Sequence, residues 1–378
     1  MKAIVNARVV VGRDVLCQKA VLFDKKIRKI VDMDKVPDIE RIDANGAYLS
    51  AGFIDLHIHG SGGADVMDAT PEALETICRV LPQTGTTAFL ATTMTMSQEK
   101  IEAALSSIVS YGGCARGASL LGAHLEGPFI NPTKHGAQDM RYVQSPDISW
   151  LTPYAETIRM ITLAPEIEGG EAFVRSLRNR YPHMVLSLGH SDADYEASIK
   201  AFESGISHVT HLFNAMSAYH HREPGVVGAC FDRNEITCDI IADTVHTHPH
   251  HLRLGFEMKK DRLILITDAM RAGCMRCGEY DLGGRLVRVE GVKATLEDGT
   301  LAGSVLKMNE ALKNMCKHTS MSLPQAVYAV TEAPAEKLGL RKKGCLREGY
   351  DADMVLFDED FSIITTFVAG KVAYRRSQ

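Results

Sequence analysis

Short apolar segments alternate with amphipathic segments through most of this chain, from residue 51 to about residue 340. Apolar runs bounded by glycine or polar residues predict buried strands, and apolar positions three or four apart predict helices. This alternation is typical of parallel βαβ units. Eight strands are predicted, at residues 53–59, 86–93, 119–125, 160–164, 185–188, 208–212, 236–242 and 263–266.

Helix signals lie between these strands. Thr70 followed by Pro71 predicts a helix with threonine as N-cap and proline in its first turn, running to about Gly85. Further helices are predicted near residue 97, over 171–180, from a cap at Ser304, and over 323–338. Eight strands with crossover helices in about 290 residues predict an α/β fold, a closed (β/α)8 TIM barrel. We expect this barrel to span residues 51–344.

Both ends of the chain are predicted to be β structure. Strand-like pieces occur at residues 3–11, 20–23 and 27–31, and again at 353–357, 363–368 and 370–374. We expect residues 1–50 and 345–378 to form one small β-sandwich domain beside the barrel. Residues 283–301 have the pattern of a β-hairpin, which would be an insertion after the eighth strand.

The composition is that of a globular protein, with 45% hydrophobic and 24% charged residues and a net charge of −5. The sequence lacks a block of five or six basic residues, which argues against a nucleic-acid or membrane-surface partner. No apolar run approaches membrane-spanning length, and charges interrupt the first twenty residues, so neither a membrane span nor a signal peptide is expected.

The nine cysteines are scattered along the chain. This distribution fits reduced thiols better than a disulfide framework, so the expected compartment is the cytoplasm. Cys274 and Cys277 form a Cys-x-x-Cys motif that could bind a metal or act in redox chemistry. A structural zinc site would need a second pair, which the sequence lacks, so a plain loop is favoured.

Candidate metal ligands stand at or just after the ends of five of the predicted strands. His57 and His59 are two residues apart on the first strand, so their side chains point to the same face and could share a metal. The full set is His57, His59, Glu126, His190, His211 and Asp268. The carboxyl ends of the strands are where such a barrel keeps its chemistry. Imidazoles with carboxylates favour a divalent transition ion, and we expect one or two Zn²⁺ or Fe²⁺ per subunit.

Each of these residues also has a plainer interpretation. A single histidine at a strand end, such as His190 or His211, is more often a hydrogen-bonded structural residue, and only the joint occurrence favours a metal site. Asp268 could take a proton from an attacking water and return it to a leaving amine. An N-cap after the eighth strand is the alternative for Asp268.

Seven segments together carry a resemblance to a known family. They are Gly-Phe-Ile-Asp-Leu-His-Ile-His at 52–59, His-Leu-Glu-Gly-Pro at 124–128, Leu-Ala-Pro-Glu at 163–166, Gly-His-Ser at 189–191, Thr-His-Leu-Phe-Asn-Ala-Met at 210–216, Arg-Glu-Pro-Gly at 222–225 and Thr-Asp-Ala at 267–269. Over essentially its whole length the chain resembles the N-acetylglucosamine-6-phosphate deacetylases of the amidohydrolase superfamily. The resemblance implies a metal-dependent amide hydrolase that acts on a C–N bond other than a peptide bond. Its expected reaction converts N-acetylglucosamine 6-phosphate to glucosamine 6-phosphate and acetate in amino sugar catabolism.

The resemblance also implies roles for the metal ligands. Glu126, His190 and His211 would hold the metal common to the family, and Asp268 would be the catalytic acid and base. The pair His57 and His59 leaves room for a second metal, with Glu126 shared between the two. The fourth strand lacks the lysine that bridges the metals in related amidohydrolases, which favours Glu126 as the bridge.

Substrate contacts carry over by position in the same way. The implied residues are Ala137, Gln138, Asn214, Ala215, Arg222 and His246. Asn214 and the N–H of Ala215 would hold the sugar phosphate. Arg222 matches an arginine that reaches across from a partner subunit, so a homodimer is expected, and a guanidinium suits phosphate oxygens. The alternative for Arg222 is a solvated polar loop.

One segment departs from the family pattern. Residues 134–138 are Lys-His-Gly-Ala-Gln, where many members have Lys-Gly-Ala-His with the histidine on the substrate. Gln138 can form hydrogen bonds but carries no charge, so the sugar epimer stays open. The alternatives are an N-acetylgalactosamine-6-phosphate deacetylase and, independently of Gln138, an amidohydrolase acting on an unphosphorylated amide and a metal-free binding scaffold.

Overall fold

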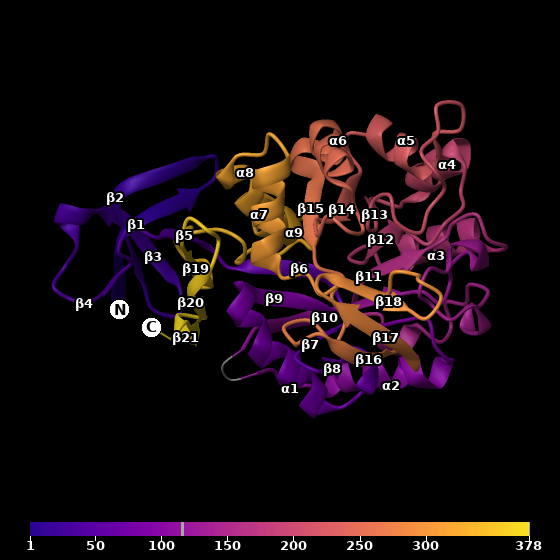
Figure 1. Cartoon of the computed structure of the whole chain (residues 1–378), viewed down its shortest axis with the longest axis horizontal. Helices are drawn as coiled ribbons and strands as arrows, with labels where there is room; N and C mark the ends of the chain where they lie inside the picture. Colours follow the sequence, from indigo (N-terminus) through magenta and orange to yellow (C-terminus); the bar gives the residue numbers. More distant parts are fainter. Residues whose placement is uncertain (115–116, 378) are drawn as a thin grey trace.

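The computed structural model describes residues 1–114 and 117–377, so positions 115, 116 and 378 of the predicted ranges lie outside it. Figure 1 shows a barrel beside a smaller β lobe that holds both termini. Eight parallel strands form the barrel wall in the order β6 (Phe53–Ile58), β9 (Thr86–Thr92), β10 (Ser119–Glu126), β11 (Ile158–Leu163), β12 (Val185–Leu188), β13 (His208–Val209), β14 (Thr237–Ile241) and β15 (Leu263–Ile266). The Asp268 N–H donates to the His57 carbonyl over 2.9 Å and so joins the last strand to the first. The predicted (β/α)8 barrel is confirmed.

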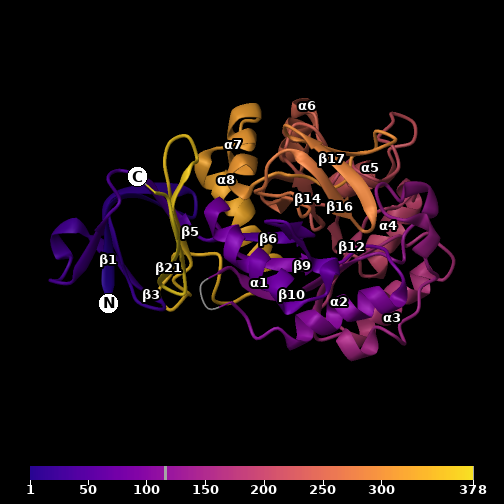
Figure 2. The same cartoon turned by 60° about the horizontal axis from the view of Figure 1, so that its bottom comes forward.

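Nine α-helices cover the outside of the barrel in the described part of the chain (Figures 1 and 2). They are α1 (Pro71–Val80), α2 (Gln98–Ser110), α3 (Gly170–Arg180), α4 (Tyr195–Ser204), α5 (Gly225–Asp232), α6 (Pro249–Lys259), α7 (Met308–His318), α8 (Leu323–Val330) and α9 (Glu332–Lys337). Thr70 caps α1 as predicted, because its hydroxyl oxygen accepts the Ala73 N–H at 3.2 Å. Most strand residues are buried because helices cover one face and the barrel interior the other.

Three local predictions were wrong. Ser304 does not cap a helix: its hydroxyl donates to the Thr267 carbonyl, and α7 begins only at Met308. The helix predicted over 323–338 is two helices, since the backbone turns away at Thr331. The strand predicted over 208–212 ends at Val209, because the chain must turn to bring His211 into the barrel mouth.

The two ends of the chain form one eight-stranded mixed sheet. Its strands are β1 (Lys2–Val11), β2 (Asp14–Phe23), β3 (Ile27–Asp32), β4 (Glu40–Asp43), β5 (Tyr48–Ala51), β19 (Met354–Phe357), β20 (Ile363–Val368) and β21 (Lys371–Arg375). β5 pairs antiparallel with β19, so the N- and C-terminal segments meet as predicted. β4 and β5 were not predicted from the sequence. Phe23 and Phe367 pack edge to face in this lobe, with ring centroids 5.6 Å apart.

Gly52 links the lobe to the barrel at a point where its backbone passes very close to Thr87. A Cβ there would lie 2.1 Å from the Thr87 hydroxyl oxygen, so only glycine fits. The Thr366 hydroxyl also donates to the Pro82 carbonyl at 2.7 Å and ties the lobe to the first helical unit.

The predicted insertion is a three-stranded antiparallel sheet, β16 (Gly278–Leu282), β17 (Arg285–Glu290) and β18 (Lys293–Leu296), labelled in Figure 1. It starts five residues before the predicted 283. Leu282 helps to line the cavity at the barrel mouth. A short hairpin, β7 (Gly60–Ser61) with β8 (Ala64–Asp65), follows β6. Across the described residues, no helix is both long and apolar enough to cross a membrane.

Candidate active site

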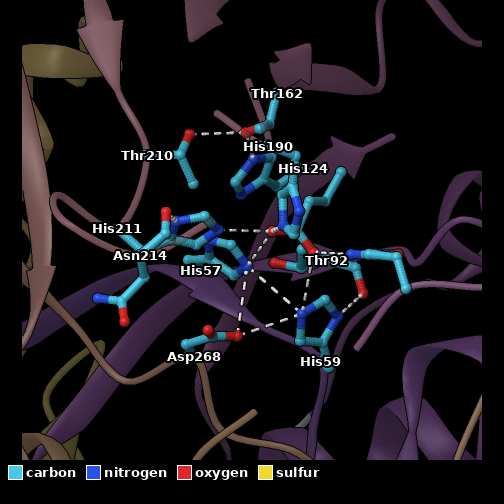
Figure 3. Close-up of polar contacts among 12 residues, drawn as sticks. His57, His59, Thr92, His124, Thr162, His190, Thr210, His211, Asn214 and Asp268 are labelled. Atoms are coloured by element: carbon cyan, nitrogen blue, oxygen red, sulfur yellow. Dashed lines mark hydrogen bonds and ion pairs between the residues drawn. The ribbon is translucent and has the colours of Figure 1, made fainter. Parts of the chain in front are cut away.

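Six side chains meet at the carboxyl end of the barrel. Figure 3 shows His57, His59, His190, His211 and Asp268 directed toward one another. Glu126 lies among them: its Oε1 is 3.2 Å from Nε2 of both His190 and His211 and 3.3 Å from Nε2 of His57, and its Oε2 is 3.3 Å from Nε2 of His59. The Asp268 Oδ1 lies 3.3 Å from His59 and 3.5 Å from His57. The predicted convergence of six residues is confirmed, and their role as ligands stays a prediction.

The ligand atoms form two groups that share one carboxylate. His57, His59 and Glu126 make the first group, and Glu126, His190 and His211 make the second, with ligand atoms within 4.8 Å of one another in each. All five residues are buried. This arrangement fits the expectation of two adjoining positions with Glu126 between them.

Three of the residues leave their strands in an uncommon backbone conformation. His190, His211 and Asp268 have φ values of 49°, 32° and 50°. Non-glycine residues rarely adopt this left-handed region, and such strain is typical of functional sites. The turn after each strand therefore directs these side chains inward.

Backbone carbonyls fix the tautomers of three imidazoles. Nδ1 of His59 lies 3.2 Å from the Thr92 carbonyl, Nδ1 of His190 lies 2.8 Å from the Lys134 carbonyl, and Nδ1 of His211 lies 3.1 Å from the Asn214 carbonyl. A carbonyl can only accept, so each Nδ1 carries the hydrogen, and in the neutral ring each Nε2 turns a lone pair toward the site. Those lone pairs face carboxylate oxygens, which are also acceptors. The donor set fits a divalent cation, because a cation satisfies all of these acceptors together.

The electrostatics of the site favour the same conclusion. Burial opposes charge on Glu126, yet the imidazoles of His57, His190 and His211 beside it hold the pKa of Glu126 well below its ordinary value. Burial likewise opposes charge on Asp268, but His57 and His59 lower its pKa to about 2. Both carboxylates stay anionic at neutral pH, so the site attracts positive charge.

Two buried aspartates that were not predicted from the sequence hydrogen-bond to the backbone of the ligand histidines. The Asp55 Oδ1 accepts the His57 N–H at 3.2 Å. The Asp239 Oδ1 accepts the His211 N–H, and its Oδ2 lies 3.0 Å from Nε2 of His208. The available signal was an acidic residue inside an otherwise apolar buried strand, since such a residue must have a partner.

His124 lies just beneath the ligands. Its Nδ1 is 3.0 Å from the Leu56 carbonyl and its Nε2 is 2.7 Å from the Thr162 hydroxyl. That hydroxyl lies 2.7 Å from the hydroxyl of Thr210 (Figure 3). Burial lowers the pKa of His124 well below its ordinary value, which keeps the ring neutral. His124 therefore cross-links barrel strands under the site.

A pocket of about 250 Å³ is lined by five of the six residues, all except the fully buried His57. Five of the predicted substrate contacts line it: Ala137, Gln138, Asn214, Ala215 and His246. Their contact with substrate stays a prediction. Asp243 holds His246 in place, because the Asp243 Oδ2 lies 2.6 Å from Nδ1 of His246.

Arg222 is the predicted site residue that the structure does not bring to this pocket. It lies on an exposed loop, where its guanidinium is 2.7 Å from Nε2 of His221. A role for Arg222 in the same chain's pocket is not supported, so its contact would have to come from another copy.

Two alternatives from the sequence are resolved by the geometry. No helix starts at Asp268 in the described chain, so the N-cap interpretation was wrong. Cys274 and Cys277 belong to neither of the ligand groups found among the described residues.

The chain is similar to proteins of a known family over most of its length. The amidohydrolase family matches residues 48–373. An N-acetylglucosamine-6-phosphate deacetylase from Bacillus subtilis is 40% identical over 363 residues, which cover 93% of this chain and 91% of that protein. The one from Lysinibacillus sphaericus is 40% identical over 355 residues, covering 92% and 91%. An N-acetylgalactosamine-6-phosphate deacetylase from Escherichia coli O157:H7 is 32% identical over 374 residues, covering 96% and 98%.

Two solved structures are similar to this chain over nearly its full length. N-acetylglucosamine-6-phosphate deacetylase from Pasteurella multocida has a TM-score of 0.92 at 32% identity and covers 98% of this chain and 99% of its own. A mutant of the Mycobacterium smegmatis enzyme in complex with N-acetyl-D-glucosamine-6-phosphate has a TM-score of 0.90 at 28% identity, covering 98% of each chain. The chain belongs to the amidohydrolase family, among its N-acetylglucosamine-6-phosphate deacetylases.

Proposed function

We propose that this chain hydrolyses the acetamide of N-acetyl-D-glucosamine 6-phosphate to give glucosamine 6-phosphate and acetate, a step of amino sugar catabolism. The observation that carries the proposal is the convergence of four histidines and two carboxylates at the barrel mouth, where all of them except the buried His57 line one pocket. Relatives that are 40% identical over more than nine tenths of the chain bear the name of this activity.

Glu126, His190 and His211 would hold one divalent ion, and His57 and His59 would hold a second with Glu126 shared. Zn²⁺ and Fe²⁺ are the proposed ions because the donor set is imidazole and carboxylate. When bound, such an ion supplies Lewis acidity that lowers the pKa of water from ~15.7 to ~7 and polarises the amide carbonyl.

Asp268 is the group we assign to proton transfer. Its carboxylate is partly open to the pocket, with 13% of the side chain exposed, whereas Glu126 is closed in at 2%. Anionic Asp268 would take a proton from the water that attacks the acetyl carbonyl. It would then deliver that proton to the sugar nitrogen, so that the C–N bond breaks with a neutral amine as leaving group.

The sugar phosphate would be held at the other side of the pocket. Asn214, Ala215 and His246 line the pocket and would hold the phosphate, Ala215 through its N–H. We infer that Arg222 of a second copy completes the phosphate site, so the proposed unit is a homodimer. Thiols spread along the chain, with a CxxC pair outside the ligand groups, support a cytoplasmic protein.

The N-acetylgalactosamine 6-phosphate epimer is the second candidate substrate, because an enzyme named for that epimer aligns over 96% of this chain. Acetate release should be measured on both phosphorylated epimers and on both unphosphorylated sugars, with metal content determined on the same sample. We expect the highest kcat/KM on N-acetylglucosamine 6-phosphate and loss of activity after chelation. Equal rates without the phosphate, or full activity without bound metal, would contradict the proposal.

A further inference from the structure

The amide of Gln138 has only one orientation that satisfies its neighbours. Its Oε1 lies 2.6 Å from the backbone nitrogen of Thr95, which can only donate. The amino group must therefore point the other way, and Nε2 donates to the Glu126 Oε2 at 2.6 Å. Gln138 is 3% exposed, so both contacts are shielded from water.

The two oxygens of the Glu126 carboxylate have different partners. Oε1 faces the imidazoles of His190 and His211 at 3.2 Å and that of His57 at 3.3 Å. Oε2 faces His59 at 3.3 Å and also takes the Gln138 hydrogen. A carboxylate oxygen accepts along two lone-pair directions. Gln138 occupies one direction of Oε2 and leaves the other for the His59 side.

We propose that Gln138 is a positioning residue that fixes the plane of the Glu126 carboxylate, so that it offers one oxygen to each of two cation positions. The inference rests on the proposed metal-dependent function. An amide donor suits this task because it binds the carboxylate without adding a positive charge beside the cations. Rotation of the carboxylate would withdraw Oε2 from His59.

The loop that carries Gln138 is itself held at several points. His135 Nδ1 lies 3.0 Å from the Gln138 carbonyl, and the Arg285 guanidinium donates to the Ala137 carbonyl at 3.3 Å. The Lys134 carbonyl accepts from Nδ1 of His190 at 2.8 Å. The same loop therefore orients a ligand of one position and the carboxylate shared by both.

The test is a titration of metal-free full-length protein with Mn²⁺, followed by calorimetry and electron paramagnetic resonance. The wild type should bind two ions and show the spectrum of a coupled pair. Gln138→Met keeps the length but removes the donor, and should weaken the second ion by about 10- to 100-fold with a smaller effect on the first. Gln138→Asn keeps an amide that is too short to span both contacts, and should behave like the methionine variant.

Gln98→Met is the matched control, because Gln98 also donates to a glutamate, Glu102, at 2.8 Å but lies on α2 away from the site. It should leave both affinities unchanged. The proposal is overturned if the wild type binds one ion only, or if either folded Gln138 variant retains wild-type affinity for the second ion. If the wild type binds one ion and still deacetylates the substrate, the proposed function stands and this inference fails. If the wild type binds two ions in a way that depends on Gln138 but does not deacetylate the substrate, this inference stands and the proposed function fails.

Discussion

The hydroxyl of Thr267 donates a 2.6 Å hydrogen bond to the carboxylate of Asp55. Asp55 lies on the first barrel strand two residues before His57, and Thr267 follows the last strand directly before Asp268. Both residues are buried, and burial raises the pKa of Asp55 to about 7. This bond sets the spacing of the two strand ends that carry His57 and Asp268.

Removal of that hydroxyl should destabilise the protein. Thr267→Val keeps the shape but leaves an Asp55 oxygen without its donor, which costs about 1–3 kcal/mol in the free energy of unfolding. The measurement is the urea midpoint of metal-free protein. Thr93→Val is the control, because the buried Thr93 hydroxyl has no partner among the described residues, and its loss should be nearly neutral. Equal effects of the two variants would count against the Asp55 link.

Asp268→Asn should separate catalysis from metal binding. The amide cannot accept the proton from water, so kcat should fall by about 10²- to 10⁴-fold. Glu126 and the four histidines remain, so metal content should stay at the wild-type level. Turnover near that of the wild type would refute the role of Asp268.

The sequence was most informative where residue type and strand position coincide. His57, Glu126 and Asp268 could be placed because parallel strands end at one rim, so residues distant in sequence share a face. Asp55 and Asp239 were missed, since their importance lies in contacts between strands that no local pattern records. The αL turns at His190 and His211 were also invisible, because these residues adopt that conformation only under tertiary constraint.

The contacts of residue 138 also could not be predicted from the sequence. Resemblance assigned Gln138 to the substrate, and the residue does line the pocket. Its amide, however, is paired with Thr95 and Glu126, 43 and 12 residues away in sequence. A family pattern identifies which positions face a site, but the partners of a substituted side chain depend on the packing around it.

Asp243→Asn should impair substrate binding more than the chemical step. The Asp243 carboxylate accepts from the His246 backbone N–H at 2.7 Å and faces Nδ1 of the same ring at 2.6 Å. An amide NH₂ in that place cannot accept a hydrogen from Nδ1, so the His246 ring loses the contact that holds it in the pocket. We expect KM to rise about tenfold with kcat and metal content little changed. A fall in kcat at constant KM would place Asp243 in the chemistry instead.

Lys337 should make stability depend on pH in the alkaline range. Burial, with Arg262 and Arg178 nearby, lowers the pKa of Lys337 from 10.5 to about 8, and its ammonium donates to the Ser207 carbonyl at 2.6 Å. Below pH 8 both states carry the proton, so the full cost of burying the charge is present. Between pH 8 and 10.5 the unfolded chain binds more protons than the folded one, so the free energy of unfolding rises with pH.

Lys337→Met removes this titration. Relative to that variant, the wild type should gain roughly 2–3 kcal/mol between those pH values. Urea unfolding of both proteins across this range measures the difference, and common effects of other groups cancel. A constant difference, or one that falls with pH, would contradict the assignment.

Arg222 can be tested by mixing two inactive variants. Its guanidinium lies on an exposed loop and contacts His221, so one chain alone does not bring it to its own pocket. In the proposed homodimer, Arg222→Ala and Asp268→Asn should each abolish or strongly reduce turnover. A mixed dimer contains one site with both native residues, since Asp268 comes from one chain and Arg222 from the other. Random exchange of equal amounts should therefore restore about a quarter of wild-type activity, because half of the dimers are mixed and each has one intact site. Sedimentation of the mixture establishes the dimer and its exchange. A dimer that exchanges subunits without any recovery would show that Arg222 does not act across the interface.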